Sequence, residues 1–310
     1  MIILVEDVKH PDALKEADIF YQKDFFNLHA QPSGTYCLGL ANGAPEHLIG
    51  VAQVAIDASH VSTPIRGTYG GIYLSPRIFS LEKAEEAIQL VENWLLQKGM
   101  KSFDIVLPPF FLSTHIQTWF NILLRRGFNI KSCDLNYAIA INDQPYEQRV
   151  NYACLKKLKK IAAAQLDVRE LNLAEFEAGH ALICQSRERK GRRFSMDWPS
   201  IQNMQQAFPH AFKMAGVFEE NELRAAGIFI QITAETTYVF AWGDDGVLNQ
   251  LTPTSLLAKY LYEYCQQQKF KFLDLGISTE AGVPNLGLIN YKLSLGAEES
   301  LKFTMTKQYE

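Results

Sequence analysis

The chain has 310 residues, enough for two domains of typical size or one large domain, each able to bury its own core. Hydrophobic residues make up 47% of it, and its formal net charge is only -4. This composition excludes a disordered chain, a collagen-like chain and a protein coated all over with positive charge. A polyanionic partner would have to contact a local basic patch.

The five cysteines are widely spaced and form no C-x-x-C pair, which favours free thiols in a reducing compartment over a disulfide framework or a zinc site. Residues 1–5 are apolar but too few for the core of a signal peptide. No stretch approaches the roughly 18 apolar residues that span a bilayer. We therefore expect a cytoplasmic protein without an integral membrane segment, and a peripheral membrane contact stays open.

In the first half, the clearest element is a helix over residues 81–98, where apolar side chains recur at helical spacing. Ser80 can cap its first amides, and Gly99 can take the left-handed conformation that ends it. The other predicted elements are strands near 36–40, 48–56, 68–74 and 103–107, and a closing hairpin over 129–141.

In the second half, Thr252 and Pro253 predict a cap and a first-turn proline for another long helix. The predicted strands lie near 213–218, 224–232, 237–242 and 270–275, followed by a closing hairpin over 300–307. A polar stretch over 142–149, which contains Pro145, is the expected joint between the halves. We therefore expect two domains, 1–145 and 146–310.

The two halves read as copies of one unit. Three pairs of like residues in corresponding elements share one spacing of 169 residues (272 − 103, 296 − 127 and 238 − 69): Phe103 and Phe272, Gly127 and Gly296, Tyr69 and Tyr238. Chance alignment of similar amphipathic elements is the alternative.

This order of elements, used twice, resembles a duplicated GNAT-type acyltransferase fold. The second half resembles the FemAB-like, Fem-type aminoacyltransferases through Thr-Pro-Thr-Ser-Leu-Leu at 252–257, Asp-Leu-Gly-Ile-Ser at 274–278, Gly-Leu-Ile-Asn-Tyr-Lys at 287–292 and Leu-Gly-Ala at 295–297. The first half resembles them through Thr-Tyr-Gly-Gly-Ile at 68–72. The resemblance implies an α/β (α+β) fold of two tandem GNAT-like domains, each a mixed, mostly antiparallel sheet flanked by helices.

Fem enzymes move an amino acid from aminoacyl-tRNA to an amine of a peptidoglycan precursor, so the resemblance implies an aminoacyl donor. The glycine-rich loop with which ordinary GNAT enzymes hold coenzyme A is missing before both long helices, at 74–80 and at 247–253. The long charged hairpin that serves some Fem members as a tRNA-binding arm is missing as well. The donor therefore stays open between aminoacyl-tRNA and acyl-CoA.

Lys292 is the strongest catalytic candidate, because a fixed cation can stabilise the oxyanion of acyl transfer or a donor phosphate. The 169-residue spacing relates it to Leu123, so only the second copy keeps the lysine. Asp274, at the end of a buried strand, could orient the incoming amine. Tyr291 could pack against the donor. The alternatives are a surface lysine, a carboxylate satisfied by loop amides, and a core tyrosine.

Further residues are candidates for substrate binding. Gly70 and Gly71 would let a ligand approach the backbone closely, unless they mark a bulged strand. Two adjacent carboxylates in a glycine-flanked segment could bind a cation, unless they only form a tight turn. The full set is Tyr69, Gly70, Gly71, Tyr238, Asp244, Asp245, Ser278 and Asn290.

Two basic patches lie in the second half. The first comprises Lys156, Lys157, Lys159 and Lys160 on a predicted helix, for which a solvated face is the alternative. The second is a better phosphate clamp, because arginine binds phosphate through two N–H groups. It comprises Arg187, Arg189, Lys190, Arg192 and Arg193.

The leading hypothesis is an acyltransferase that forms an amide on an amino group of a cell-envelope precursor, related to peptidoglycan or polysaccharide. Its acceptor would be a small molecule or a lipid-linked molecule, and tRNA could serve as donor. No H-E-x-x-H or G-x-S-x-G motif occurs, which argues against a zinc hydrolase and a serine hydrolase. The hypothesis requires no metal, and we expect no tightly bound cofactor. The rivals are a coenzyme A dependent GNAT N-acyltransferase and a catalytically silent ligand-binding or scaffold protein. The oligomeric state stays open.

Overall fold

The structure is a computed structural model that describes residues 1–6, 8, 14, 17–31, 33–248, 250–280 and 282–309. Its contacts form two compact units. Unit 1 comprises Met1–Leu135, Thr279–Val283 and Ser300–Glu310, and unit 2 comprises Asn136–Ser278 and Pro284–Glu299. The predicted domains, 1–145 and 146–310, concern the two copies in the sequence and not this division by contacts. Their boundary stays a prediction.

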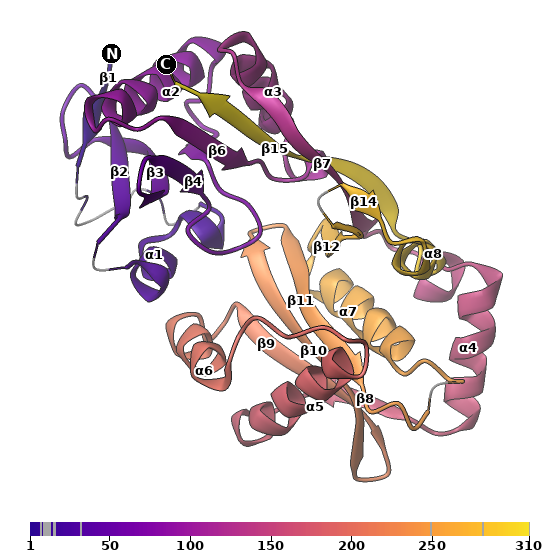
Figure 1. The fold of residues 1–310 in the computed structure, drawn as a ribbon. Helices are drawn as coiled ribbons and strands as arrows, with labels where there is room; N and C mark the ends of the chain where they lie inside the picture. The colour runs from indigo at the N-terminus through magenta and orange to yellow at the C-terminus, as the bar shows by residue number, and fades with distance from the viewer. Residues whose placement is uncertain are drawn as a thin grey trace. The chain divides into compact units, whose positions relative to one another are not determined.

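Unit 1 is built on a mostly antiparallel sheet in which β4 and β6 are the parallel neighbours. Its strands follow the order β1-β2-β3-β4-β6-β15, where β15 is Glu298–Gln308, and β5 also pairs with β3. The strands are β1 (Ile2–Val5), β2 (Thr35–Asn42), β3 (Leu48–Asp57), β4 (His60–Thr63), β5 (Ile72–Leu74) and β6 (Ser102–Val106) (Figure 1).

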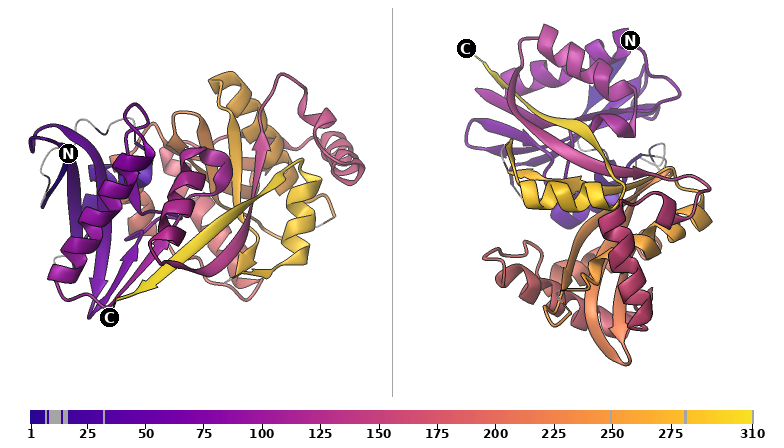
Figure 2. Two further views of the ribbon diagram at one scale, coloured as in Figure 1. Left: turned by 90° about the horizontal axis from the view of Figure 1, so that it is seen from above. Right: turned by 90° about the vertical axis from the view of Figure 1, so that its right-hand side faces the viewer.

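Helix α2 (Leu81–Gln97) forms as its sequence predicts, because the Ser80 side chain accepts a hydrogen bond from the backbone N–H of Lys83. Gly99 follows it with a φ of +74°. Helix α3 (His115–Arg125) contacts α2, and the two helices cover the strands of unit 1 (Figures 1 and 2). Their inner faces fill the core of this unit with Ala84, Ala87, Ile88, Val91, Leu95, Ile116, Ile122 and Leu123. The short helices of unit 1 are η2 (Ile19–Tyr21), α1 (Lys23–His29) and η3 (Phe110–Leu112).

Unit 2 has a sheet of the same kind, with strand order β7-β12-β11-β10-β9-β8 and a parallel pairing of β11 with β12. The strands are β7 (Asn129–Ala140), β8 (Asp167–Glu170), β9 (Phe212–Glu219), β10 (Glu222–Thr233), β11 (Thr236–Asp244) and β12 (Phe272–Ile277). The helices are η4 (Tyr146–Gln148), α4 (Tyr152–Ala163), η5 (Leu173–Glu175), α5 (Phe176–Glu188), α6 (Trp198–Ala207), α7 (Thr254–Gln268) and α8 (Leu286–Ser294). Both α5 and α7 pack on the sheet.

The hairpins predicted at the end of each copy are wrong. Each closing segment is one long strand, β7 and then β15 (Glu298–Gln308), and each is divided between the units. Residues 136–140 of β7 pair with β12 in unit 2, whereas residues 304–308 of β15 pair with β6 in unit 1. A local pattern cannot reveal this exchange, because the partners are far apart in the chain. The short strands β13 (Thr279–Glu280) and β14 (Val283–Pro284) form a separate ribbon.

The structure supports the internal repeat. In each unit a parallel pair of strands, β4 with β6 and β11 with β12, is connected through a long helix, α2 or α7. Gly127 after α3 and Gly296 after α8 both have left-handed φ angles, +85° and +82°. The predicted fold class, two GNAT-like units each with a mixed, mostly antiparallel sheet and flanking helices, is confirmed.

Two local predictions need correction. Tyr69 lies outside any strand, because the expected strand over 68–74 is only β5 and is preceded by the unpredicted β4. Thr252 does not cap α7; it has a φ of +54°, and Pro253 takes the cap position. Within the polar stretch over 142–149, Tyr146 is fully buried and donates a hydrogen bond to the carbonyl of Leu295, whereas residues 142–145 are exposed. The role of this stretch as the joint between the copies stays a prediction.

All five cysteines have free thiols. Among the described residues, no helix combines the length and the apolar character that crossing a bilayer requires.

Candidate functional site

The candidate site lies in unit 2, where the parallel strands β11 and β12 stop pairing. Their register runs from Thr236 opposite Phe272 to Tyr238 opposite Asp274. On the other side of β12, the register with β7 shifts between Asp274 and Ile277. Gly276 lies within this shift and has a φ of +74°, which a residue with a side chain adopts only with strain. At the end of β12, backbone groups that would bond to a neighbouring strand in a regular sheet are therefore available to other partners.

Lys292 uses these released groups. Helix α8 begins after Asn285, whose side chain accepts a hydrogen bond from the N–H of Leu288, and Lys292 is its buried residue, at 3% exposure. The Lys292 Nζ donates to the carbonyl oxygens of Gly276 at 2.7 Å and Ile277 at 2.8 Å. The alternative of a surface lysine is therefore wrong. The ring of Tyr137 lies 5.8 Å from the same nitrogen.

The surroundings of Lys292 disfavour its charged form. Burial lowers the pKa of Lys292 to about 7, an effect that the Asp274 carboxylate opposes and the Arg187 guanidinium increases. Two carbonyl oxygens hold the amine in a fixed position. An amine so placed can act as a cation at neutral pH and lose its proton within a physiological range.

Asp274 is 3% exposed and is held from two sides. Its Oδ1 accepts hydrogen bonds from the Asn136 Nδ2 at 2.7 Å and from the backbone N–H of Gly276 at 2.8 Å. The alternative for Asp274 was a carboxylate satisfied by loop amides; the backbone amide that it binds belongs to β12 instead. Asn136 was missed, because it lies 138 residues away in the chain and carries no motif.

Arg187 and Tyr238 complete the site. Arg187 lies in the last turn of α5, and its Nε is buried without a hydrogen-bond partner among the described residues. Burial lowers the pKa of Arg187, and neighbouring Arg192 lowers it further. Burial and the Asp274 carboxylate raise the pKa of Tyr238. A Cβ on Gly276 would lie only 3.1 Å from the Tyr238 ring, so the glycine allows this ring to pack against β12.

The structure divides the predicted arginine cluster. Of its five members, Arg187 and Arg192 have charges that act on each other, and Arg187 alone has a partly buried side chain. Arg189 is bonded to the carbonyl of Asp244 and lies 3.4 Å from its Oδ1. Lys190, Arg192 and Arg193 are exposed.

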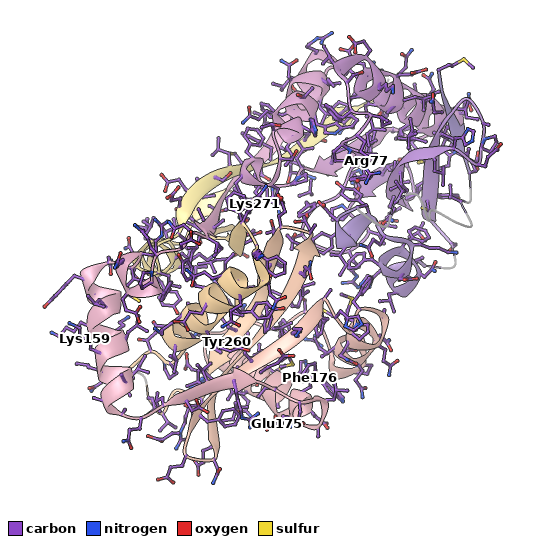
Figure 3. The ribbon with its side chains drawn as sticks, turned by 180° about the vertical axis from the view of Figure 1, so that it is seen from behind. Arg77, Lys159, Glu175, Phe176, Tyr260 and Lys271 are labelled. Atoms are coloured by element: carbon purple, nitrogen blue, oxygen red, sulfur yellow. The ribbon has the colours of Figure 1, made fainter. Side chains whose placement is uncertain are left out.

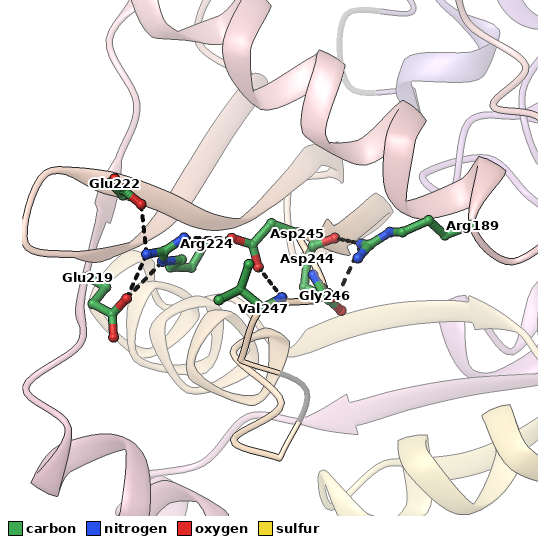
Figure 4. A network of polar contacts seen from close by, with 8 residues as sticks. All are labelled: Arg189, Glu219, Glu222, Arg224, Asp244, Asp245, Gly246 and Val247. Atoms are coloured by element: carbon green, nitrogen blue, oxygen red, sulfur yellow. Dashed lines mark hydrogen bonds and ion pairs between the residues drawn. The ribbon is translucent and has the colours of Figure 1, made fainter.

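The predicted acidic pair is held by ion pairs and turn amides (Figure 4). Asp244 pairs with Arg189, and its Oδ1 also accepts the N–H of Gly246 at 3.1 Å. Asp245 pairs with Arg224 at 3.0 Å, and its other oxygen accepts the N–H of Val247. These contacts match the structural alternative of an acidic tight turn. In the part of the chain that the structure describes, no cluster of three or more histidine, cysteine, aspartate or glutamate side chains could hold a metal ion.

Other predicted residues lie around α8. The Tyr291 hydroxyl is 2.7 Å from the Thr254 Oγ1 at the start of α7, and its ring contacts Trp242, so Tyr291 joins α8 to its neighbours. The Ser278 hydroxyl is buried and has no hydrogen-bond partner among the described residues. Asn290 is exposed.

The first-copy candidates lie in unit 1 and are engaged by their own unit. Tyr69 is 1% exposed and donates a hydrogen bond to the Asp18 Oδ2 at 2.9 Å. A Cβ on Gly70 would meet the Thr63 Oγ1 at 2.3 Å, and the Gly71 N–H donates to the same oxygen at 2.7 Å. The two glycines are therefore required for the packing of unit 1 itself, and their role in binding a substrate stays a prediction.

A scan against protein-family models finds no match, and a search of curated proteins finds no similar sequence. Among solved structures, FemX aligns with a TM-score of 0.72 over 97% of this chain and 94% of that chain, at 11% identity. L-PGS from Bacillus licheniformis aligns with a TM-score of 0.60 over 86% and 83%, at 10% identity. A tandem GNAT protein from the clavulanic acid biosynthesis pathway aligns with a TM-score of 0.55 over 99% and 98%, at 9% identity. The chain therefore has a FemX-like fold composed of two tandem GNAT-like domains.

Proposed function

We propose that this protein is a cytoplasmic acyl- or aminoacyltransferase that forms an amide on an amino group of a cell-envelope precursor. The observation that carries the proposal is the buried Lys292 at the point where β11 and β12 separate, with its Nζ held by two carbonyl oxygens. A buried lysine without a carboxylate hydrogen-bonded to it destabilises the fold, so its retention there favours a chemical role. The similarity in fold to FemX supports the same reaction class.

In the proposed reaction, the amine nitrogen of the acceptor attacks the carbonyl carbon of an ester or thioester donor. A C–N bond forms, the C–O or C–S bond to the donor breaks, and the proton lost by the amine goes to the departing oxygen or sulfur. Negative charge collects on the carbonyl oxygen in between, and the Lys292 ammonium stabilises it. Asp274 accepts an N–H of the amine and so orients it, while Arg187 binds a phosphate of the substrate.

The donor decides between the two forms of this proposal. Helix α7 begins with Pro253 at its cap position, and the N–H groups of Ser255 and Leu256 bond to the carbonyls of Thr252 and Pro253. A pyrophosphate would find few free amides there, which favours aminoacyl-tRNA over acyl-CoA. A thermal shift with aminoacyl-tRNA and none with acetyl-CoA is the expected result, and the reverse would assign the protein to the coenzyme A dependent acyltransferases.

The test of catalysis is Lys292→Ala in a transfer assay with an acceptor that the wild-type protein uses. Loss of one oxyanion-stabilising group lowers kcat by about 10²–10³-fold. Lys302→Ala is a matched control, because Lys302 is also buried, at 6% exposure, and donates to the carbonyl of Thr68 in unit 1. The control should keep its kcat.

Equal activity of Lys292→Ala and wild type would exclude the proposed role of the lysine. If no donor is turned over by wild-type protein with any envelope amine, the chain is a ligand-binding or scaffold protein of the same fold.

A further inference from the structure

Helix α8 buries a charged side chain and exposes apolar ones, which is the opposite of an ordinary surface helix. Its lysine, Lys292, is buried at 3% exposure, whereas Leu286 and Leu293 are 70% and 41% exposed. Most of the helix is apolar, and soluble proteins rarely present several apolar side chains together on an exposed helix. The buried lysine belongs to the candidate site, but the exposed leucines have no part in it and need a separate explanation.

Helix α4 contacts α8 and presents positive charge. The backbone N–H of Asn151, the cap of α4, donates to the carbonyl of Ser294 at the end of α8, at 3.2 Å. The start of α4 therefore lies against the end of α8, so that Tyr152, which is 80% exposed, and Leu293 belong to the same junction.

The lysines of α4 are unneutralised. Lys156, Lys159 and Lys160 are exposed and share one side of the helix through their spacing of three and four residues (Figure 3 labels Lys159). No aspartate or glutamate occurs from residue 150 to residue 166. Among the described residues, no carboxylate forms an ion pair with these lysines, although the protein as a whole has a net charge of -4.

We infer that α4 and α8 form a docking surface for an anionic lipid bilayer, onto which unit 2 binds peripherally. A bilayer surface offers phosphate groups for the lysines of α4, an interfacial layer for the ring of Tyr152, and acyl carbon for Leu286 and Leu293. An RNA backbone would satisfy the lysines but would leave the leucines exposed to water. This inference does not depend on the proposed chemistry at Lys292.

The test is co-sedimentation of the full chain with vesicles of phosphatidylcholine alone and of phosphatidylcholine mixed with phosphatidylglycerol. The wild-type protein should bind the anionic vesicles selectively, and added salt should weaken the binding. Each lysine near an anionic surface contributes about 1 kcal/mol, so the triple variant Lys156→Gln, Lys159→Gln, Lys160→Gln should bind about 100-fold more weakly.

A matched control has the same change in net charge at scattered positions. The variant Lys83→Gln, Lys101→Gln, Lys269→Gln should bind vesicles within a few-fold of wild type. A second variant, Leu286→Asn with Leu293→Asn, should bind more weakly but keep the salt dependence of wild type, because it changes the apolar contribution alone. All substituted residues of the docking surface are exposed, so thermal melting should be close to that of wild type.

Three outcomes would overturn the inference. The wild-type protein could fail to prefer anionic over neutral vesicles, or the α4 triple variant could bind them as well as the scattered control does. Binding of tRNA that requires the α4 lysines, together with unchanged vesicle binding by the same variant, would make α4 a nucleic-acid surface instead.

Discussion

The two units carry different residues at the positions that the 169-residue spacing relates. Lys292 of unit 2 corresponds to Leu123 of unit 1, and Asp274 corresponds to Ile105. All four side chains are buried, but Leu123 and Ile105 belong to the hydrophobic core of unit 1. The same framework is thus filled with apolar side chains in one unit and with charged groups in the other.

The corresponding tyrosines of the two units, Tyr69 and Tyr238, have neighbours of opposite charge. Tyr238 of unit 2 has the charge of Arg187 nearby, whereas Tyr69 of unit 1 bonds to Asp18, which the same spacing relates to Arg187. Burial of a cation costs free energy unless the charge is paired, so we expect the buried cations of unit 2 to serve the reaction.

The largest effect is expected when the lysine of unit 2 is introduced into unit 1. Leu123→Lys buries an amine among apolar side chains, and a pKa shift of 3–5 units for such a group corresponds to about 4–7 kcal/mol of the free energy of unfolding. Leu124→Lys is the control, because Leu124 is 42% exposed and should change that free energy by less than about 0.5 kcal/mol. Urea unfolding measures both. Equal stability of the two variants would show that unit 1 can hold the lysine as unit 2 does.

The next effect concerns the pH dependence of transfer. Since the pKa of Lys292 is about 7, the ammonium that we propose to stabilise the oxyanion is lost as pH rises above that value. Its contribution should fall about tenfold per pH unit, or about 100-fold by about pH 9. Lys292→Arg stays charged throughout, so the ratio of wild-type to variant kcat isolates the lysine from ionisation of the acceptor amine. A ratio that is constant with pH would contradict the oxyanion role.

Asp18 of unit 1 should make stability depend on pH in a different window. Burial raises its pKa from 3.8 to about 6, so the protonated form favours the folded state. The stability it contributes is complete below about pH 4 and is lost as pH rises to about 6, by up to about 1.4 kcal/mol per pH unit. Thermal melting of Asp18→Asn should show no such loss.

Lys292 of unit 2 should act in the opposite direction, because its pKa is lowered in the folded state. The stability of the protein should therefore rise with pH from about 7 to about 10.

The smallest effect is expected at the acidic turn of unit 2. Asp245→Asn removes one partner of Arg224, which also pairs with Glu219 and Glu222, and should cost about 0.5–1 kcal/mol of stability. Its transfer activity should equal that of wild type, because the carboxylate is engaged in the turn. A tenfold loss of kcat with an unchanged melting temperature would return Asp245 to the candidate catalytic residues.

Local elements were the most predictable part of this protein. The helix from Leu81, its cap at Ser80 and its end at Gly99 follow from side-chain periodicity and from contacts between near neighbours. The break at 64–71 between β4 and β5 was not predicted, because it depends on how Thr63 packs against the glycines that follow.

The candidate site was only partly predictable. The motif identified Lys292 and Asp274, but nothing in their neighbourhood indicated Asn136, which comes from β7. From the sequence, the acidic pair at 244–245 could equally have been a cation site. In the structure its carboxylates pair with Arg189, which follows α5, and with Arg224 of β10. Long-range partners such as these are chosen by packing, which a one-dimensional pattern does not record.

The amino-acid sequence by itself indicated the duplication and the order of most strands and helices. It also showed that the lysine of α8 in the second copy corresponds to a leucine in the first copy. Tertiary structure decided that this lysine is buried, that two backbone carbonyls hold it and that β7 and β15 divide their residues between the units. The physical reason is that periodicity and capping depend on residues within a few positions of each other. Burial, charge environment and strand pairing depend on groups that meet only when the chain is folded.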